Sequence, residues 1–546
     1  MALETVSLVL ILLFAVVVSS AITRALPIAI PAPIAQIATG VIIGLFGAIR
    51  VTLDPELLFY LLLPPLLFLD GWRLPKDSLF RDSKLVLELA LALVIFTVFG
   101  IGYLIHWMIP VMPLPVAFAL GAVLSPTDPI AVSSITARSP IPPRMMRILE
   151  RESLLNDASG LVCLRFAVAT AMTGAFVLHE AALQFVWMGG AGLAIGILMT
   201  LITMRAKEWF TDQFGEESGP QIVVSLLIPF GAYILAEKVE ASGIIAAVAA
   251  GLTMTFSQAS RQSLPATRMR QNSVWDALQF VGHGIIFVLL GEQLPNIVAN
   301  AERTVASAGH PGLWWLAIYV FAVTGALMIL RFAWVWTSLK LTPLRGGIDD
   351  GVRSADLKLV AAFAVAGVRG AITLAGILTL PILLGDGTSF PARDLAIFIA
   401  AGVILLSLCI ASVALPMLLR GLEIPGKPAE IIAEDRARIA LATVALATIN
   451  EIRDRYSMEE RDHGERDRAT GRIADIYREI IAARSHSGAA ASEERSLEQV
   501  GREVRLAAVK AQRTELTRLM KSREISSDLM SKLLRELDLL ELHYRA

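Results

Sequence analysis

Long apolar runs separated by short polar segments follow one another over most of the chain. A helix needs about 20 mostly apolar residues to span the hydrocarbon core of a bilayer, and about thirteen runs approach this length. They lie near residues 5–22, 27–49, 56–72, 85–109, 114–136, 149–177, 182–204, 219–237, 241–257, 274–295, 312–337, 358–382 and 393–419. The pattern predicts an all-α polytopic membrane protein.

The pattern changes after about residue 426. Beyond this point roughly 37% of the residues are charged, against about 12% before it. Leucines recur there at helical spacing, for example Leu529, Leu533, Leu537 and Leu540. We therefore expect a membrane domain over residues 1–425 and a helical tail over 426–546. The tail should form about four amphipathic helices, with breaks near 463–464 and 485–488. The tail helices could pack on each other, on the tail of a second copy or on the inner surface of the membrane.

Lys and Arg gather in every second loop between the apolar runs. The odd-numbered loops contain, among others, Arg24, Lys76, Arg138, Lys207, Arg268 and Lys340, whereas the segments 112–114 and 178–180 contain neither residue type. Cytoplasmic loops carry an excess of Lys and Arg. The alternation therefore predicts a multi-pass protein of the cell membrane with its N-terminus outside and its tail in the cytoplasm.

Composition excludes several other classes of protein. Hydrophobic residues make up 55% of the chain, charged residues 18%, and the net charge is -1, so there is no basic surface for nucleic acid. The two cysteines offer no disulfide framework or Cys/His metal spacing. The 7 histidines form no H-E-x-x-H motif, and no phosphate-binding loop is present. We expect neither an enzyme nor a bound cofactor.

Two of the apolar runs are interrupted by residues that break helices. The fifth run contains Ser125-Pro126-Thr127-Asp128-Pro129, and the twelfth contains Gly367-Val368-Arg369-Gly370-Ala371-Ile372-Thr373. Proline removes a backbone donor and disturbs the preceding turn. Runs one to six and runs eight to thirteen can be compared as two halves, and each interrupted run is the fifth of its half. The halves are offset by seven runs, and an odd offset gives them opposite orientations in the membrane. Inverted repeats with two discontinuous helices are typical of secondary transporters. The alternative is two unrelated kinked helices.

The sixth run carries acids where a spanning helix should be apolar. Ser153, Asn156, Asp157 and Gly160 share one helix face, since residues three and four apart are neighbours. Charges inside a span are costly and mark functional sites. Asp157, the deepest acid, is expected to bind either a cation or a proton. The alternative is a structural ion pair with Arg165.

Other charged residues in the spans have expected structural roles. Glu152 should pair with a buried arginine, and both Arg331 and Arg369 are available. Asp128 could be a direct cation ligand or could orient the site. Glu237 is expected at the outer interface, with a gate as the alternative.

Three motifs together, S-P-T-D-P, E-S-L-L-N-D-A-S-G and G-V-R-G-A-I-T, resemble those of the first class of monovalent cation:proton antiporters. This family contains bacterial sodium/proton antiporters related to the animal sodium/proton exchangers. The resemblance covers about residues 5–420. It implies a homodimer in the lipid membrane, with each protomer divided into core and dimerisation helices.

The resemblance also implies roles for site residues. Asp157 would carry the ion and the proton, with Asn156 beside it. Sodium would bind at Asp157, Ser153, Thr127 and Asp128. An ion pair between Glu152 and Arg331 would stabilise the fold. Arg369, which lies in the glycine-rich run, would stabilise the broken helices.

The expected function is exchange of sodium for protons, with lithium or potassium as further substrates, in pH homeostasis. The resemblance further implies that this exchange is electroneutral. Exchange would proceed by alternating access, with cation and proton competing for Asp157. The alternatives are a potassium/proton antiporter of the same fold and a cation channel. The only small partners would be the transported sodium ion and proton.

Overall fold

The computed structural model is helical throughout the part of the chain that it describes, apart from one isolated bridge between Leu383 and Ser389. The described residues are 2–25, 30–46, 55–73, 83–136, 141–173, 178–215, 217–259, 265–307, 313–341, 357–384, 387–420, 428–457, 463–485, 489–522 and 527–545. The chain divides into two compact units, Met1–Ile424 and Pro425–Ala546.

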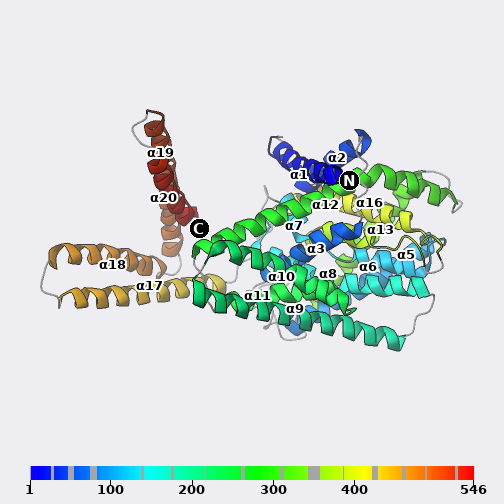
Figure 1. Cartoon of the computed structure of the whole chain (residues 1–546), viewed down its shortest axis with the longest axis horizontal. Helices are drawn as coiled ribbons and strands as arrows, with labels where there is room; N and C mark the ends of the chain where they lie inside the picture. Colours follow the sequence, from blue (N-terminus) through cyan, green and yellow to red (C-terminus); the bar gives the residue numbers. More distant parts are fainter. Residues whose placement is uncertain are drawn as a thin grey trace. The chain divides into compact units, whose positions relative to one another are not determined.

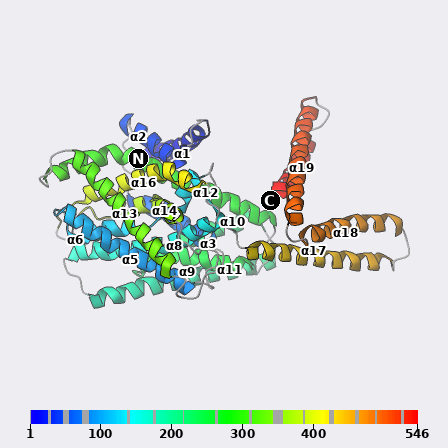
Figure 2. The same cartoon turned by 180° about the vertical axis from the view of Figure 1, so that it is seen from behind.

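The first unit contains the apolar helices (Figures 1 and 2). They are α1 (Ala2–Ala25), α2 (Ala32–Phe46), α3 (Pro55–Arg73), α5 (Ser83–Met108), α6 (Leu114–Leu124), α7 (Pro129–Ile135), α8 (Pro143–Thr173), α9 (Leu178–Phe214), α10 (Ser218–Lys238), α11 (Gly243–Ala259), α12 (Pro265–Ser307), α13 (Leu313–Leu341), α14 (Leu357–Val365), α15 (Ala371–Leu378) and α16 (Arg393–Leu419). Each predicted apolar run falls on one helix or on one pair of helices. The all-α membrane fold and both helix breaks are thus confirmed.

Fewer helices meet a strict length and hydropathy requirement than the about thirteen predicted. Among the described residues, seven helices are long and apolar enough to cross a membrane, and eight if the bent pair α6 and α7 counts as one span. The difference has two physical causes. Some helices are short, as α2 is with 15 residues. Others carry charged residues, as α8 does around Glu152 and Asp157.

The helices of the first unit pack in two groups. In one group α11 packs on α3, α9 and α10, while α2 lies along α12. This last crossing is close, since a Cβ on Gly291 would overlap the carbonyl oxygen of Ile37. The other group consists of α5, α6, α8 and α13 to α16, which surround the two helix breaks, and α12 touches both groups. The three motif-bearing runs therefore belong to the same group.

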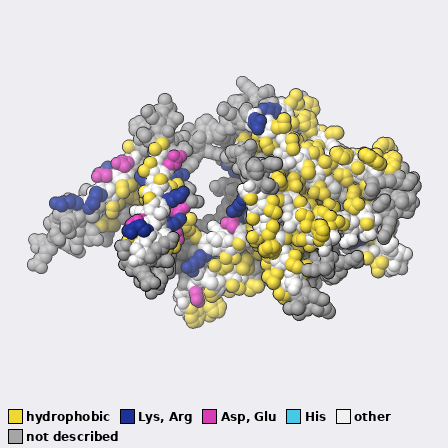
Figure 3. Space-filling model, turned by 90° about the horizontal axis from the view of Figure 1, so that it is seen from above, with side chains coloured by type: hydrophobic (Ala, Val, Ile, Leu, Met, Phe, Trp, Pro, Cys, Tyr) yellow, Lys and Arg dark blue, Asp and Glu magenta, His cyan; other side chains and the backbone are white. Residues whose placement is uncertain are grey.

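Hydrophobic side chains cover much of the outside of the first unit (Figure 3). Phe14, Phe46, Trp107 and Trp314 are each more than two thirds exposed. Such a surface would be unfavourable in water and suits the hydrocarbon of a bilayer.

The second unit contains four helices, as predicted for the tail: α17 (Pro428–Ser457), α18 (His463–Ser485), α19 (Ala489–Lys521) and α20 (Ser527–Arg545). α17 packs along α18 and α19 along α20. Arg513 on α19 pairs with Asp538 and Glu541 on α20 at 2.5 and 2.6 Å. α17 ends at Ser457 and α18 begins at His463, so the break predicted near 463–464 falls at the start of α18. The segments 458–462 and 486–488 lie outside the described residues.

Candidate ion-binding site

The two helix breaks meet in the middle of the motif-bearing group. α6 ends at Leu124 and α7 begins at Pro129, with a bend of 51° between them. α14 ends at Val365 and α15 begins at Ala371. The backbone N–H of Asp128 donates to the carbonyl oxygen of Val368 at 2.8 Å, so the two extended segments are joined directly.

Asp128 satisfies backbone donors of both short helices that follow the breaks. Its Oδ1 accepts from the N–H groups of Ile130 and Ala131 at 2.9 and 3.0 Å, which makes it the N-cap of α7. Its Oδ2 accepts from the N–H of Ala371, at the start of α15, at 3.4 Å. Two helix N-termini, each with a partial positive charge, therefore face one carboxylate. This geometry favours the orienting role over that of a free ligand.

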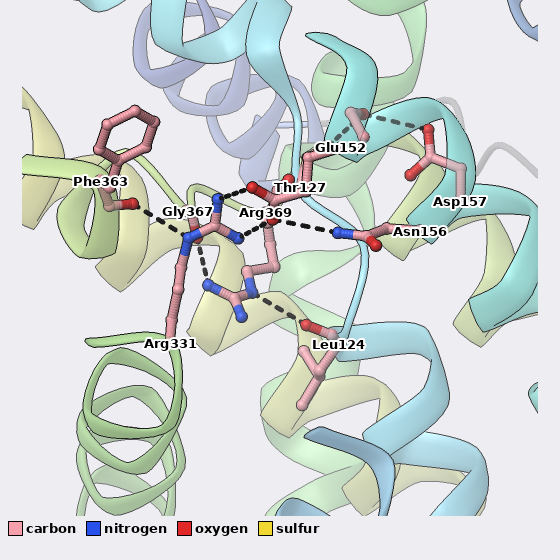
Figure 4. A network of polar contacts seen from close by, with 10 residues as sticks. Leu124, Thr127, Glu152, Asn156, Asp157, Arg331, Phe363, Gly367 and Arg369 are labelled. Carbon is pink, nitrogen blue, oxygen red and sulfur yellow. Dashed lines mark hydrogen bonds and ion pairs between the residues drawn. The ribbon is translucent and has the colours of Figure 1, made fainter. Parts of the chain in front are cut away.

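Arginines satisfy the carbonyl groups on the other side of the breaks (Figure 4). Arg369, 3% exposed, donates from Nε to the carbonyl of Leu124 at 2.9 Å and from Nη1 to that of Gly367. Arg331 donates from Nε to the carbonyl of Phe363 at 3.0 Å. Unpaired carbonyls at helix C-termini are costly when buried, so these guanidinium groups stabilise the broken helices.

Glu152 pairs with Arg331 rather than with Arg369. The Arg331 Nη1 lies 2.8 Å from Glu152 Oε1, and Nη2 donates to Oε2 at 3.0 Å. This two-contact geometry suits the planar guanidinium. Asn156 donates from Nδ2 to Glu152 Oε1 at 3.2 Å. Asn156 therefore belongs to the ion-pair network, and Figure 4 shows it directed toward Glu152, away from the Asp157 carboxylate.

Asp157 is buried, with 3% of its surface exposed. The Ser153 hydroxyl lies 2.6 Å from the carbonyl oxygen of Thr127 and 3.4 Å from Asp157 Oδ2. A hydroxyl has one hydrogen to donate, and the shorter distance assigns it to Thr127. The other oxygen, Oδ1, has no hydrogen-bond partner among the described residues. The alternative pairing with Arg165 is wrong, because Arg165 contacts Glu237 at 2.6 Å.

Asp157 lines a cavity of about 500 Å³. Ser153, Thr127 and Asp128 line the same cavity, so four of the predicted site residues meet there, whereas Asn156 does not line it. The wall also contains polar residues from α3, α8 and α12: Asp70, Arg73, Glu150, Gln279 and His283. At the cavity edge, Arg73 pairs with Asp276 and donates to Gln279 at 2.6 Å.

Asp70 is the residue that the sequence analysis missed. It belongs to the predicted run near 56–72 and stands three residues before Arg73, where an acid is easily taken for the end of a span. In the structure it contributes a further carboxylate to the wall of the cavity that Asp157 lines. The available signal was the position of Asp70 within an otherwise apolar run.

The oxygen atoms around Asp157 suit a hard cation. Carboxylate, hydroxyl and carbonyl oxygens converge there, and these are the ligands that alkali and alkaline-earth ions prefer. No cluster of three His, Cys, Asp or Glu side chains with metal-binding geometry occurs within the described part of the chain.

Asp128 caps the N-termini of both α7 and α15, and it should therefore stabilise the folded protein. Asp128→Ala removes the acceptors for three backbone N–H groups and should lower the free energy of unfolding by about 2 kcal/mol, since each lost cap costs about 1 kcal/mol. Asp128→Asn keeps one acceptor oxygen and should recover about half of this loss. Unfolding of the purified variants, followed by tryptophan fluorescence in detergent, measures both.

Gly370→Ala is a matched test of the same contact. A methyl group at this position would overlap the carboxylate of Asp128, so the variant should resemble Asp128→Ala in stability. Equal stability of Asp128→Ala, Gly370→Ala and the unmodified protein would contradict the capping role.

Comparison with known proteins agrees with this architecture. Residues 9–421 match the family described as sodium/hydrogen exchanger, transmembrane. The chain is 40% identical over 542 residues to a protein of Escherichia coli strain K12 named an uncharacterized Na(+)/H(+) exchanger, YjcE, and the match covers 98% of this chain and 97% of that protein.

Two further similarities concern parts of the chain. A Bacillus subtilis protein named sodium, potassium, lithium and rubidium/H(+) antiporter is 38% identical over 419 residues, which cover 75% of this chain and 61% of that protein. The solved structure of the sodium proton antiporter MjNhaP1 from Methanocaldococcus jannaschii matches with a TM-score of 0.57 and 19% identity, over 77% of this chain and 99% of that chain. The second similarity concerns the fold alone.

Proposed function

The chain belongs to the sodium/hydrogen exchanger family, and we propose that it is a secondary antiporter that exchanges sodium ions for protons at Asp157. The observation that carries this proposal is a buried carboxylate that lines a polar cavity and has one oxygen without a hydrogen-bond partner among the described residues. A carboxylate in this position can take up a proton or a cation, but the two cannot occupy it together.

Occupancy of Asp157 controls movement of the site. An ionised carboxylate is costly in a low-dielectric environment, and either ligand neutralises it. Sodium would bind to Asp157 with help from the carbonyl oxygen of Thr127 and the hydroxyl of Ser153. Asp128 holds both short helices and so fixes the position of that carbonyl, while Asp70 adds negative charge to the cavity that attracts cations. With sodium or a proton bound, the site moves through the apolar interior of the membrane domain more easily than it does when it is empty and charged.

The proposed exchange is electroneutral, one sodium ion for one proton, as the motif resemblance implies, with Asp157 as the carboxylate that carries both. Asn156 supports this stoichiometry, because it is neutral and its amide is engaged by Glu152. Potassium and lithium are further candidate substrates, since the name of the Bacillus subtilis relative includes both ions. A cation channel is the competing function, and it would pass current without a fixed exchange ratio.

Orientation and assembly are part of the proposal. The distribution of Lys and Arg among the loops supports an outer N-terminus and a cytoplasmic tail in the cell membrane. The cavity would then open to the cytoplasm, because Arg73 lies at its edge and ends the helix that precedes a basic loop. The motif resemblance supports a homodimer, and the exchange would serve pH homeostasis.

Purified protein in proteoliposomes tests the proposal. The vesicles contain a pH-sensitive dye and an imposed pH gradient, and sodium, lithium, potassium or rubidium is added outside. Sodium should dissipate the gradient, and clamping the membrane potential with potassium and valinomycin should leave the sodium-driven rate unchanged. A rate that follows the membrane potential would contradict electroneutral exchange, and no response to any of the four cations would refute exchange.

A further inference from the structure

An ion pair joins α8 to α10 beyond the proposed binding site. Arg165 lies eight residues after Asp157 on α8, about 12 Å further along the helix axis. Its Nη2 is 2.6 Å from Oε1 of Glu237, near the end of α10, and the two side chains are 34% and 27% exposed. The same Glu237 oxygen accepts from the backbone N–H of Gly243, the first residue of α11, at 3.0 Å.

The two helices that this pair connects belong to different packing groups. α8 packs on α5, α6, α7 and α15, whereas α10 packs on α3, α9, α11 and α12. These two sets of main packing partners have no helix in common within the described part of the unit. The contact between Arg165 and Glu237 therefore bridges the boundary between the group that carries Asp157 and the group that packs around α11.

The pair lies at the end of the unit opposite the cavity. On α8 the cavity is lined by Met146, Glu150, Ser153 and Asp157, all of which precede Arg165. On α3 it is lined by Asp70 and Arg73 at the C-terminal end. The other end of α3 carries Tyr60, whose ring packs edge-on against Tyr233, one turn from Glu237, with centroids 5.6 Å apart. The cavity reaches Asp157 from one side, and this cluster lies beyond Asp157 on the other side.

We propose that the Arg165–Glu237 pair is a latch that closes the far-side path to Asp157 and opens once in each transport cycle. The inference rests on the proposed exchange function, because alternating access requires the two helix groups to separate on this side. The chemistry suits repeated opening. A partly exposed ion pair is weak enough to break. Glu237 also keeps a partner when Arg165 leaves, namely the positive N-terminus of α11.

A reversible tether tests whether the pair must separate. In a background with Cys163→Ala and Cys409→Ala, the double variant Arg165→Cys/Glu237→Cys is treated with a short bis-methanethiosulfonate reagent. Exchange should stop on tethering and return after reduction with dithiothreitol. The single variants Arg165→Cys and Glu237→Cys react with the same reagent but cannot be bridged, so they should continue to exchange. Continued exchange by the tethered protein would show a static structural pair and would overturn the latch.

Accessibility provides a second test that does not require transport. Leu161 lies one turn from Asp157 and one turn from Arg165 on α8 and is 3% exposed. In the same background, Leu161→Cys is labelled with a membrane-impermeant methanethiosulfonate from the face opposite the cavity. Adding Arg165→Gln/Glu237→Gln should raise the labelling rate about fivefold, because losing one partly exposed ion pair shifts an opening equilibrium by at most about this factor.

The matched control breaks the ion pair at the cavity edge instead. Arg73→Gln/Asp276→Asn should not raise labelling of Leu161→Cys from the opposite face. An unchanged rate in Arg165→Gln/Glu237→Gln, or an equal rise in both double variants, would contradict the latch. If the unmodified protein shows no exchange at all, the proposed function fails, while the labelling comparison still decides whether the pair closes this path.

Discussion

Asp157→Asn should reduce sodium/proton exchange to below about 1% of the unmodified rate, because an amide neither releases a proton nor neutralises a cation. The substitution preserves the shape of the side chain, and the 2.6 Å contact between Ser153 and Thr127 does not depend on it. The protein should therefore fold and insert normally. The rate is measured in proteoliposomes as sodium-driven collapse of a pH gradient, with the amount of folded protein checked by size-exclusion chromatography.

Glu150→Gln is the matched control for this variant. Glu150 lies on the same helix and lines the same cavity, but its side chain is exposed. Neutralising it removes one negative charge from the cavity without touching Asp157. We expect exchange to persist, with a weaker apparent affinity for sodium. Exchange by Asp157→Asn at a rate close to that of Glu150→Gln would refute the central role of Asp157.

Breaking the ion pair between Glu152 and Arg331 should have the largest effect on stability. Arg331 is 3% exposed and makes both ion-pair contacts and a bond to the Phe363 carbonyl. Glu152→Gln leaves this guanidinium without its counter-ion, which typically costs about 3–5 kcal/mol in a buried site. Thermal unfolding of the membrane protein in detergent should therefore begin at a clearly lower temperature.

The double variant Glu152→Gln/Arg331→Met separates the pair from its surroundings. Removing both charges leaves no unpaired buried ion, so the double variant should be more stable than Glu152→Gln alone. The bond to Phe363 is still lost, so recovery should be incomplete. Additive losses from the two substitutions would contradict a direct and energetically coupled pair.

The arrangement of the broken helices could be predicted because it depends on local chemistry. Pro126 and Pro129 end one helix and begin the next, and the glycines around Arg369 do the same in the matching run. The sequence could not show which groups satisfy the freed backbone atoms. Asp128 and Arg369 do so across the two breaks, over a separation of more than 240 residues.

The polar face of α8 could be predicted only in outline. Helical spacing places Asn156 and Asp157 together, yet successive residues point about 100° apart. In the structure Asn156 contacts Glu152 and Asp157 faces the cavity. Asp70 and the Arg165–Glu237 pair depend on how α3 and α10 pack near α8. Periodicity along one helix contains no information on that packing. The sequence therefore did not single out Asp70, and it offered Asp157 rather than Glu237 as a partner for Arg165.

Proton release on cation binding tests the central claim most directly. Purified protein is held in weakly buffered detergent solution at a pH where Asp157 is protonated, and sodium is added while the pH is recorded. Competition for one carboxylate predicts that each sodium ion bound displaces one proton, and that Asp157→Asn releases none. Sodium binding without proton release, or equal release from Asp157→Asn, would contradict it.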